Sequence, residues 1–214
     1  MRLFSYWRSG TSYRVRLALA FKSADIEIVP VNLLEGAHRQ DKFLRINPQG
    51  LVPSLELEDG QIISQSPAII EYIDDVLPGP KLFPDDPLAR ATVRQMAALI
   101  GCDVHPLQNL RVLNYVRDPL GHGDVAVRRW AQHWIGLGFE ALEALAQDIA
   151  PDAPYLTGDQ VTAAECYLIP QLFGARRYGL DLSAYPRLLA VEDAVQSLPA
   201  AHLAHPDQQP DATQ

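Results

Sequence analysis

Apolar positions in the N-terminal part of the chain follow two different periods. Short apolar or alternating runs at 2–6, 26–33, 51–57 and 61–64 are typical of strands, and the spacing at 12–22 and 38–46 predicts helices. The sequence EDG at 58–60 favours a tight hairpin between the last two strands. A further helix is expected to begin with Ser66 as its N-cap and Pro67 at the first helical position. The order β-α-β-α-β-β-α predicts a small α/β domain.

The pattern changes after a proline-rich segment at 77–87, which is typical of a linker. Beyond it, apolar spacing predicts helices at 87–118, 124–149, 162–176 and 187–198, without the alternation of strands. We therefore expect an α/β domain at 1–83 and an all-α helical bundle at 87–214. Pro106 is expected to bend the first of these helices, and the polar segment 206–214 to be disordered.

Charge and composition exclude several classes of function. The formal net charge is −8, which disfavours partners such as nucleic acid or an anionic membrane surface. No apolar run approaches the ~18 residues of a membrane span, and arginines at 8, 14 and 16 interrupt any signal peptide. Cys102 and Cys166 are far apart, so neither a disulfide framework nor a metal site is expected. Both are expected to be buried, in a cytoplasmic protein.

The stretch "WRSGTS" places small hydroxyl residues between a predicted strand and a predicted helix. A helix N-terminus exposes unpaired N–H groups and a partial positive potential. Ser9, Thr11 and Ser12 can add hydroxyl donors to an anion there, while Gly10 allows a close approach. The alternative is that Ser9 or Ser12 only caps the helix.

Two further features belong to the same α/β domain. Gln65 and Ser66 stand at another predicted helix N-terminus, which makes a second potential anion site. Val52-Pro53 comes directly before a strand, where proline cannot continue the ladder; this bond is a candidate for the cis form.

These segments carry a family resemblance that covers nearly the whole chain. "VPSLEL" and "ISQSPAIIEYI" resemble the glutathione-binding half of the glutathione transferase superfamily. "WRSGTSYRVRLAL" and "GCDVHPLQNLRVL" are similar to its zeta class, which includes maleylacetoacetate and maleylpyruvate isomerases. The resemblance implies a thioredoxin-like domain followed by a helical bundle. It also implies glutathione as cofactor, a homodimer and a cytosolic location.

The resemblance assigns residues to glutathione. Ser9, Gly10 and Thr11 would form the corner that contacts the thiol, although many zeta-class sequences read serine-serine-cysteine at these positions. The backbone of Val52, before the expected cis-Pro53, would pair with the cysteinyl part. The remaining candidates are Gln65 and Ser66 for the γ-glutamyl end, with His38, Gln49, His105, Asn109 and Arg111.

The candidate catalytic residues are Ser9, Thr11 and three arginines. A free thiol has a pKa near 8.5, and donors at a helix N-terminus lower it, so Ser9 would stabilise a thiolate rather than attack. Arg8, Arg111 and Arg176 suit the carboxylates of a small dicarboxylic keto acid. Arg8 could instead make a surface salt bridge, and the sequence leaves open whether Arg176 or its neighbour Arg177 faces a pocket.

The implied reaction is a cis–trans isomerisation. The thiolate adds to a cis double bond conjugated to a ketone, the resulting single bond rotates, and elimination leaves the fumaryl isomer without consuming glutathione. One alternative is a transferase that conjugates other electrophiles, such as α-halo acids. Another is a glutathione-binding protein without catalysis.

Two helical motifs are expected to be structural. Trp130, His133 and Trp134 have helical spacing and are interpreted as packing residues rather than a cofactor site. Thr162 and Glu165 are expected to form a capping box.

Overall fold

The computed structural model describes residues 1–212, whose contacts divide the chain into two units. Unit 1 contains Met1–Phe83 and the segment from Gln196 onward, and unit 2 contains Pro84–Val195. The division after Phe83 falls in the proline-rich segment. At the other end, unit 2 stops at Val195, whereas the sequence division extended the helical domain to 214.

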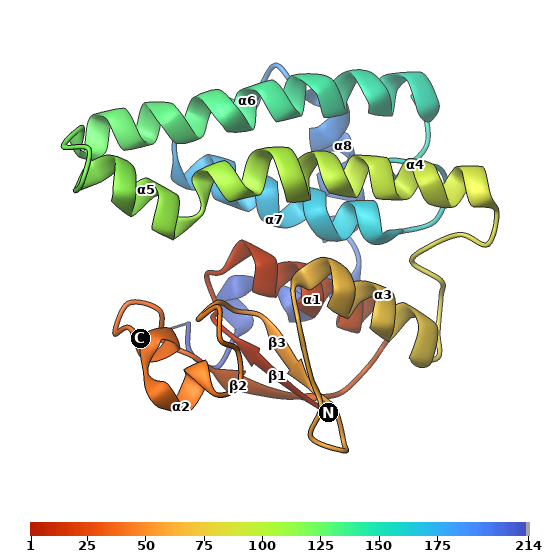
Figure 1. Ribbon diagram of the computed structural model, residues 1–214. Coiled ribbons are helices and arrows are strands. Elements are labelled where there is room, and N and C mark those ends of the chain that lie inside the picture. Colours follow the sequence, from red (N-terminus) through yellow and green to blue (C-terminus); the bar gives the residue numbers. More distant parts are fainter. Residues whose placement is uncertain (213–214) are drawn as a thin grey trace. The chain divides into compact units, whose positions relative to one another are not determined.

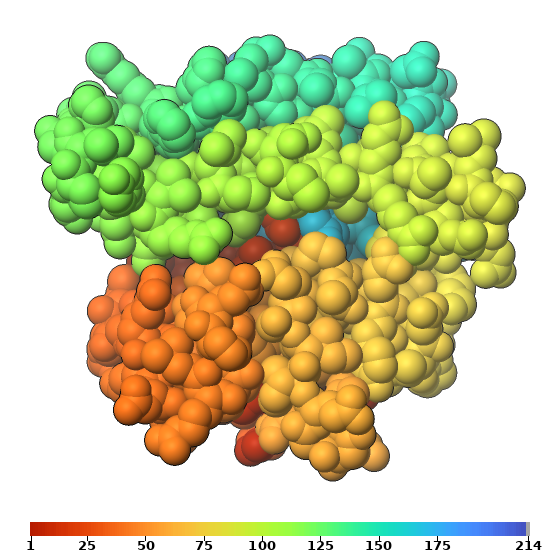
Figure 2. Space-filling model, viewed as in Figure 1, coloured from red at the N-terminus to blue at the C-terminus, as the bar shows by residue number. Residues whose placement is uncertain are grey.

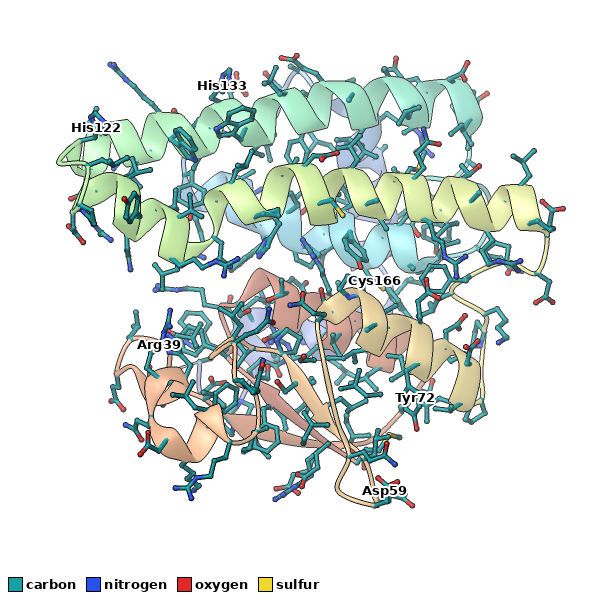
Figure 3. All side chains as sticks on the ribbon, in the orientation of Figure 1. Arg39, Asp59, Tyr72, His122, His133 and Cys166 are labelled. Carbon is teal, nitrogen blue, oxygen red and sulfur yellow. The ribbon has the colours of Figure 1, made fainter. Side chains whose placement is uncertain are left out.

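Unit 1 is built on a mixed sheet (Figure 1). Within residues 1–212 the sheet has four strands in the order β2-β1-β3-β4: β1 Arg2–Ser5, β2 Glu27–Pro30, β3 Ser54–Glu56 and β4 Ile62–Ser64. β1 pairs in parallel with β2, and the other pairs are antiparallel, with β3 and β4 joined by the expected hairpin. Asp59 lies at the tip of that hairpin (Figure 3). Leu3 and Leu55 face each other across β1 and β3, and both are fully buried.

Helices cover the sheet of unit 1. They are α1 Gly10–Phe21, η1 Ala37–Arg39, α2 Asp41–Leu44, α3 Ser66–Val76, α9 Pro199–Ala204 and η4 Pro206–Gln208. α1 contacts both α3 and α9 (Figure 1). A separate apolar cluster contains Phe4, Tyr6, Val31, Phe43 and Val52, with the Phe4 and Phe43 rings edge to face.

Two helix starts in unit 1 differ from the sequence prediction. α1 begins at Gly10, two residues early, because Ser9 is its N-cap. α3 begins at Ser66 itself, so the expectation that Ser66 is the N-cap is wrong. Gln65 takes that position, with a positive φ of 74°, and Pro67 follows at the second helical position.

The C-terminal segment also differs from the prediction. Pro206–Gln208 forms η4, and Asp211 is only 3 % exposed, so the expectation of disorder is wrong up to residue 212. Residues 213–214 lie outside the described part of the chain. Within this polar segment, the Asp211 carboxylate accepts from the Trp7 backbone N–H in the loop between β1 and α1.

Unit 2 is helical. Its elements are α4 Pro87–Ala98, the π-helical turn η2 Leu99–Val104, the 3₁₀ turn η3 His105–Gln108, α5 Leu110–Arg117, α6 Gly123–Ile149, α7 Ala163–Arg177 and α8 Pro186–Gln196. In the face drawn in Figure 2, the run from α4 to α5 and the long helix α6 form a continuous surface. α7 packs against α4, and α6 packs against η2, η3 and α5.

The helix expected at 87–118 is interrupted rather than bent. Pro106 has no N–H, and its ring conflicts with the carbonyl of Cys102 one turn earlier in an α-helix. The chain widens into η2 before this proline and tightens into η3 at it. Gly138 of α6 admits the widened turn, because a Cβ there would lie 2.1 Å from Val104 Cγ2.

Of three other structural predictions, those for the capping box and for Cys166 are confirmed, and that for Cys102 is wrong. The capping box of α7 is confirmed: Thr162 caps the helix, and Glu165 accepts from the Thr162 backbone N–H at 2.7 Å. Burial raises the pKa of Glu165, against the hydrogen bonds from Thr162 and Leu156. Cys166 is buried as expected, but Cys102 is exposed on η2, so that prediction is wrong.

Residues 1–212 contain neither a candidate membrane span nor a candidate metal site. Over this range, no helix combines the length and apolar character needed to cross a bilayer. Likewise, the described His, Cys, Asp and Glu side chains form no group of three or more that could hold a metal ion.

Candidate functional site

Ser9 lies at the start of α1 and contacts two neighbouring groups. Its Oγ accepts a hydrogen bond from the Ser12 N–H at 3.2 Å, which is the N-cap contact. It also lies 3.0 Å from Thr11 Oγ1, which in turn donates to the Val52 carbonyl at 3.0 Å. Because a threonine hydroxyl carries one proton, the proton between Ser9 and Thr11 belongs to Ser9. Ser9 therefore caps the helix with its oxygen and donates its one proton to Thr11, so it can donate to a bound ligand only by turning away from Thr11.

Val52 connects this corner to the sheet. The Val52-Pro53 peptide bond is cis, as expected, and β3 begins directly after it at Ser54. Val52 and Pro53 are both buried. The structure thus brings together Ser9, Thr11 and the backbone of Val52, which the sequence predicted from separate segments.

Arg8 lies beside this corner, and its guanidinium carbon is 5.4 Å from the centroid of the Trp7 ring. A cation over an aromatic face is held by the ring quadrupole. The guanidinium group has five N–H donors, so it can hold a carboxylate while it contacts Trp7.

Arg16 of α1 holds the loop between β1 and α1 by hydrogen bonds, and it is not among the site residues that the sequence predicts. It is 4 % exposed and donates to the Tyr6 carbonyl at 3.3 Å and to the Trp7 carbonyl at 2.9 Å. Burial lowers the pKa of Arg16 to about 10, against the raising effect of Tyr13 and Asp211, so it stays charged at neutral pH. In the sequence, the only indication of this role is that Arg16 is a charged residue within the apolar run "YRVRLALA".

Gln65 and Gln49 form a second part of the site in unit 1. Gln65 Nε2 donates to Gln49 Oε1 at 2.6 Å, although the two residues come from different segments. Gln65 has a φ of 74°, a conformation that non-glycine residues adopt at a cost and that is concentrated at functional positions. Its side chain does not cap α3 in the described contacts. Ser66 is buried, and its Oγ accepts from Arg14 Nη1 at 3.4 Å.

The segment around His38 approaches the same loop. A Cβ added at Gly50 would lie 2.9 Å from the His38 carbonyl oxygen, and Gly50 has a φ of 61°. Glycine is therefore required at position 50. His38 Nδ1 is buried and has no hydrogen-bond partner within the described contacts. Burial, and then the charge of Arg39, lower the pKa of His38, so the imidazole is neutral near pH 7.

Three further candidates lie in unit 2, where η3 leads into α5. His105 begins η3, and Asn109 is the N-cap of α5. Asn109 Oδ1 accepts from the Arg111 backbone N–H at 3.2 Å, and the Arg111 side chain is exposed. The structure brings these three residues together on one short segment.

Arg176 is placed differently from the expectation of an available cation. Its guanidinium donates from two nitrogens to the two carboxylate oxygens of Glu192, on α8 of the same unit. That hydrogen bond raises the pKa of Arg176, against burial. Arg176 therefore has a carboxylate partner within its own unit.

The aromatic motif of α6 has a packing role for its tryptophans. Trp130 Nε1 donates to the Leu107 carbonyl at 2.7 Å, and the Trp130 and Trp134 rings pack edge to face. His133 projects from α6 to solvent while its ring contacts Trp134 (Figure 3). The tryptophans hold η3, and thereby the segment of His105 and Asn109, against α6.

Comparison with protein families identifies both parts of the chain. The glutathione S-transferase N-terminal domain matches residues 1–75, and the glutathione S-transferase C-terminal domain matches residues 128–194.

Relatives of known name cover nearly the full length. Maleylacetoacetate isomerase from Pseudomonas aeruginosa is 47 % identical over 99 % of this chain and 98 % of its own. Maleylpyruvate isomerase from a Ralstonia species is 43 % identical over 99 % of this chain and 100 % of its own.

Solved structures agree with these relatives. A holo maleylpyruvate isomerase, described as a bacterial zeta-class glutathione S-transferase, has a TM-score of 0.95 and 44 % identity, and the match covers 99 % of each chain. Maleylacetoacetate isomerase from Methylobacterium extorquens AM1, with bound malonate and glutathione, has a TM-score of 0.96 and 34 % identity, over 100 % of both chains.

Proposed function

This chain belongs to the glutathione S-transferase family, and we propose that it is a glutathione-dependent cis–trans isomerase of maleylacetoacetate or maleylpyruvate. The observation that carries the proposal is the near-complete match to isomerases of both names, at 47 % and 43 % identity. The product is the corresponding fumaryl isomer, and the place of the reaction is the breakdown of aromatic compounds.

The residues of unit 1 fit glutathione. The Ser9 hydroxyl, which can turn from Thr11 to a ligand, lies beside the backbone of Val52 before cis-Pro53, which suits the cysteinyl part. Gln65 is held at a positive φ next to an α3 N-terminus that its side chain does not cap, which suits the γ-glutamyl carboxylate. The unpartnered Nδ1 of neutral His38 and the neighbouring Gln49 provide polar groups for the glycyl end.

The mechanism depends on how these residues treat negative charge. When bound, glutathione supplies a thiolate that adds reversibly to the conjugated double bond of the substrate. On binding, the Ser9 hydroxyl turns from Thr11 and donates its proton as a hydrogen bond toward the sulfur, and the N-terminus of α1 adds a positive potential, so the pKa of the thiol falls. Because Thr11 keeps its own proton on the Val52 carbonyl, it does not donate to the Ser9 oxygen, and the Ser9 proton is available for this turn. Neither residue acts as a nucleophile.

Charge on the substrate is assigned to arginines. Arg8, seated on Trp7, holds one carboxylate or the ketone oxygen as negative charge grows on it. Arg111, exposed at the start of α5, is assigned to a second carboxylate. Arg176 contributes if its hydrogen bonds to Glu192 exchange for substrate. Malonate bound with glutathione in the Methylobacterium extorquens relative supports a dicarboxylic substrate.

The proposal includes a cytoplasmic homodimer that needs no metal, nucleic acid or membrane. A second candidate function is conjugation by a zeta-class transferase, for example on α-halo acids, which the match to glutathione S-transferase domains favours. A third candidate, glutathione binding without catalysis, is disfavoured because the matched relatives are named as isomerases.

An assay with both keto acids tests the proposal. Enzymatically generated maleylacetoacetate and maleylpyruvate are followed by absorbance, each with and without glutathione. We expect conversion only with glutathione, and the ratio of rates identifies the substrate. Conversion of neither acid by protein that still binds glutathione would reject the isomerase proposal.

A further inference from the structure

The loop that carries Arg8 and Ser9 is held by residues from opposite ends of unit 1. The Trp7 N–H donates to Asp211 Oδ2 at 3.0 Å, across 204 positions of the sequence. Asp211 is 3 % exposed, although it lies near the C-terminus in a polar segment. A buried carboxylate is costly unless it is paired and hydrogen-bonded, and the Trp7 N–H is such a partner.

Arg16 completes this support from the other side of the same peptide groups. It donates to the Tyr6 and Trp7 carbonyls and, through Nε, to the Ala204 carbonyl at the end of α9, at 3.1 Å. The same guanidinium group therefore holds the loop and the helix that precedes the Asp211 segment. The negative charge of Asp211 also raises the pKa of Arg16, against burial.

Contacts within the loop leave little freedom around Ser9. The Ser9 N–H donates to the Tyr6 carbonyl at 3.0 Å, and the Tyr6 N–H donates to Ser12 Oγ at 3.4 Å. Trp7 has its N–H on Asp211 and its carbonyl on Arg16. A shift of Trp7 would therefore move both Arg8, which lies on its ring, and Ser9, which follows two residues later.

We propose that Asp211 is a positioning residue of the isomerase: by holding the Trp7 amide together with Arg16, it sets where Arg8 and Ser9 meet glutathione and substrate. This inference rests on the proposed function for its effect on turnover. Its effect on the bound thiol requires only that the protein binds glutathione. Asp211 is thus the residue of the C-terminal segment that takes part in tuning the thiol.

The sign of the effect separates positioning from simple charge. Asp211→Asn keeps the size of the side chain and an acceptor for Trp7, but it removes the negative charge and weakens that acceptor. Removing a negative charge would by itself stabilise a nearby thiolate and lower the thiol pKa. A displaced Trp7 loop would instead weaken the hydrogen bond from Ser9 to the sulfur, which raises the thiol pKa.

The experiment is a pH titration of the thiolate absorbance of glutathione bound to the full-length protein. We expect Asp211→Asn to raise the thiol pKa by about half a unit and Asp211→Ala by about one unit, a tenfold smaller thiolate fraction in the latter. kcat should fall in the same order, with little change in KM for glutathione. Asp207→Asn is the matched control, because Asp207 is in the same segment with its side chain 68 % exposed; it should leave both quantities unchanged.

An unchanged or lowered thiol pKa in folded Asp211→Asn would overturn the proposal, and so would an equal shift in Asp207→Asn. If Asp211→Ala does not fold, the isosteric variant still decides. A normal thiol titration in wild-type protein that isomerises neither keto acid would reject the proposed function alone, and the variants would still test Asp211.

Discussion

Replacement of Ser9 by alanine should affect stability and thiol chemistry separately. The side chain has two contacts: its oxygen accepts from the Ser12 N–H at 3.2 Å, and its hydroxyl lies 3.0 Å from Thr11 Oγ1. The first is a helix cap, and the second holds the proton that we assign to the thiolate once glutathione is bound. Ser9→Ala removes both.

The two losses have different sizes. Loss of an N-cap costs about 1 kcal/mol, which for a chain of 150–250 residues lowers Tm by roughly 2–4 °C. Loss of a hydrogen bond to a charged sulfur costs about 1.5–3 kcal/mol, which raises the pKa of the bound thiol by about one to two units at 1.36 kcal/mol per unit. At neutral pH, kcat should fall by up to the same ten- to hundredfold factor.

A cap variant elsewhere separates the effects. Asp86 caps α4, its carboxylate accepting from the Ala89 N–H at 2.8 Å. Asp86→Ala should lower Tm by a similar amount and leave the thiol titration as in wild type. Thermal unfolding and the pH dependence of thiolate absorbance measure the two quantities on the same samples.

If Ser9→Ala lowers Tm but keeps the wild-type thiol pKa, Ser9 is only a helix cap, and our assignment of its proton is wrong. If both variants shift the thiol pKa equally, the effect comes from lost stability and the reasoning fails in the same way.

Three further predictions concern strain, packing and burial. Gln65→Gly should relieve the cost of a φ of 74°, which raises the free energy of unfolding by roughly 1 kcal/mol and therefore raises Tm, while KM for glutathione increases. An unchanged KM would show that the strained residue has no binding role. Gly138→Ala should cost about 1–3 kcal/mol in denaturant unfolding, because its Cβ would lie 2.1 Å from Val104 Cγ2. The control Gly136→Ala is in the same helix, and its Cβ would lie 3.6 Å from the Tyr185 hydroxyl oxygen, so it should be neutral or stabilising; equal costs would contradict the packing argument. Burial raises the pKa of Glu165 above its ordinary 4.5, so the folded state holds the Glu165 proton more tightly than the unfolded state does. The stability that this proton contributes is therefore lost as pH rises through the pKa of the folded state. Glu165→Gln should therefore be less stable than wild type by a margin that narrows as pH rises from 4.5, and unfolding curves in which the margin widens would reverse the assigned sign.

Local patterns were sufficient to predict most elements of both units. The hairpin at EDG, the cis bond at Pro53 and the capping box of Thr162 each depend on a few adjacent residues, and each is present in the structure. Ser9 shows the limit of such reasoning. Capping and anion binding were set against each other, whereas its contacts with Ser12 and Thr11 are compatible with both.

The errors arise where a distant partner decides the local structure. Asp211 is polar and near the C-terminus, yet it is buried because its partner is the Trp7 amide at the other end of the chain. Arg16 has its partners on the first loop and on α9, which no local spacing reveals. Cys102 has apolar sequence neighbours, but it lies on the π-helical turn before Pro106 and is exposed there.

In the proposed reaction, glutathione is a catalyst and not a substrate. The most direct measurement is therefore a thiol balance with glutathione far below the concentration of the keto acid. The isomerase account predicts complete conversion to the fumaryl isomer while the free thiol concentration stays constant. A reaction that stops when the thiol is exhausted would identify a conjugating transferase and contradict the account.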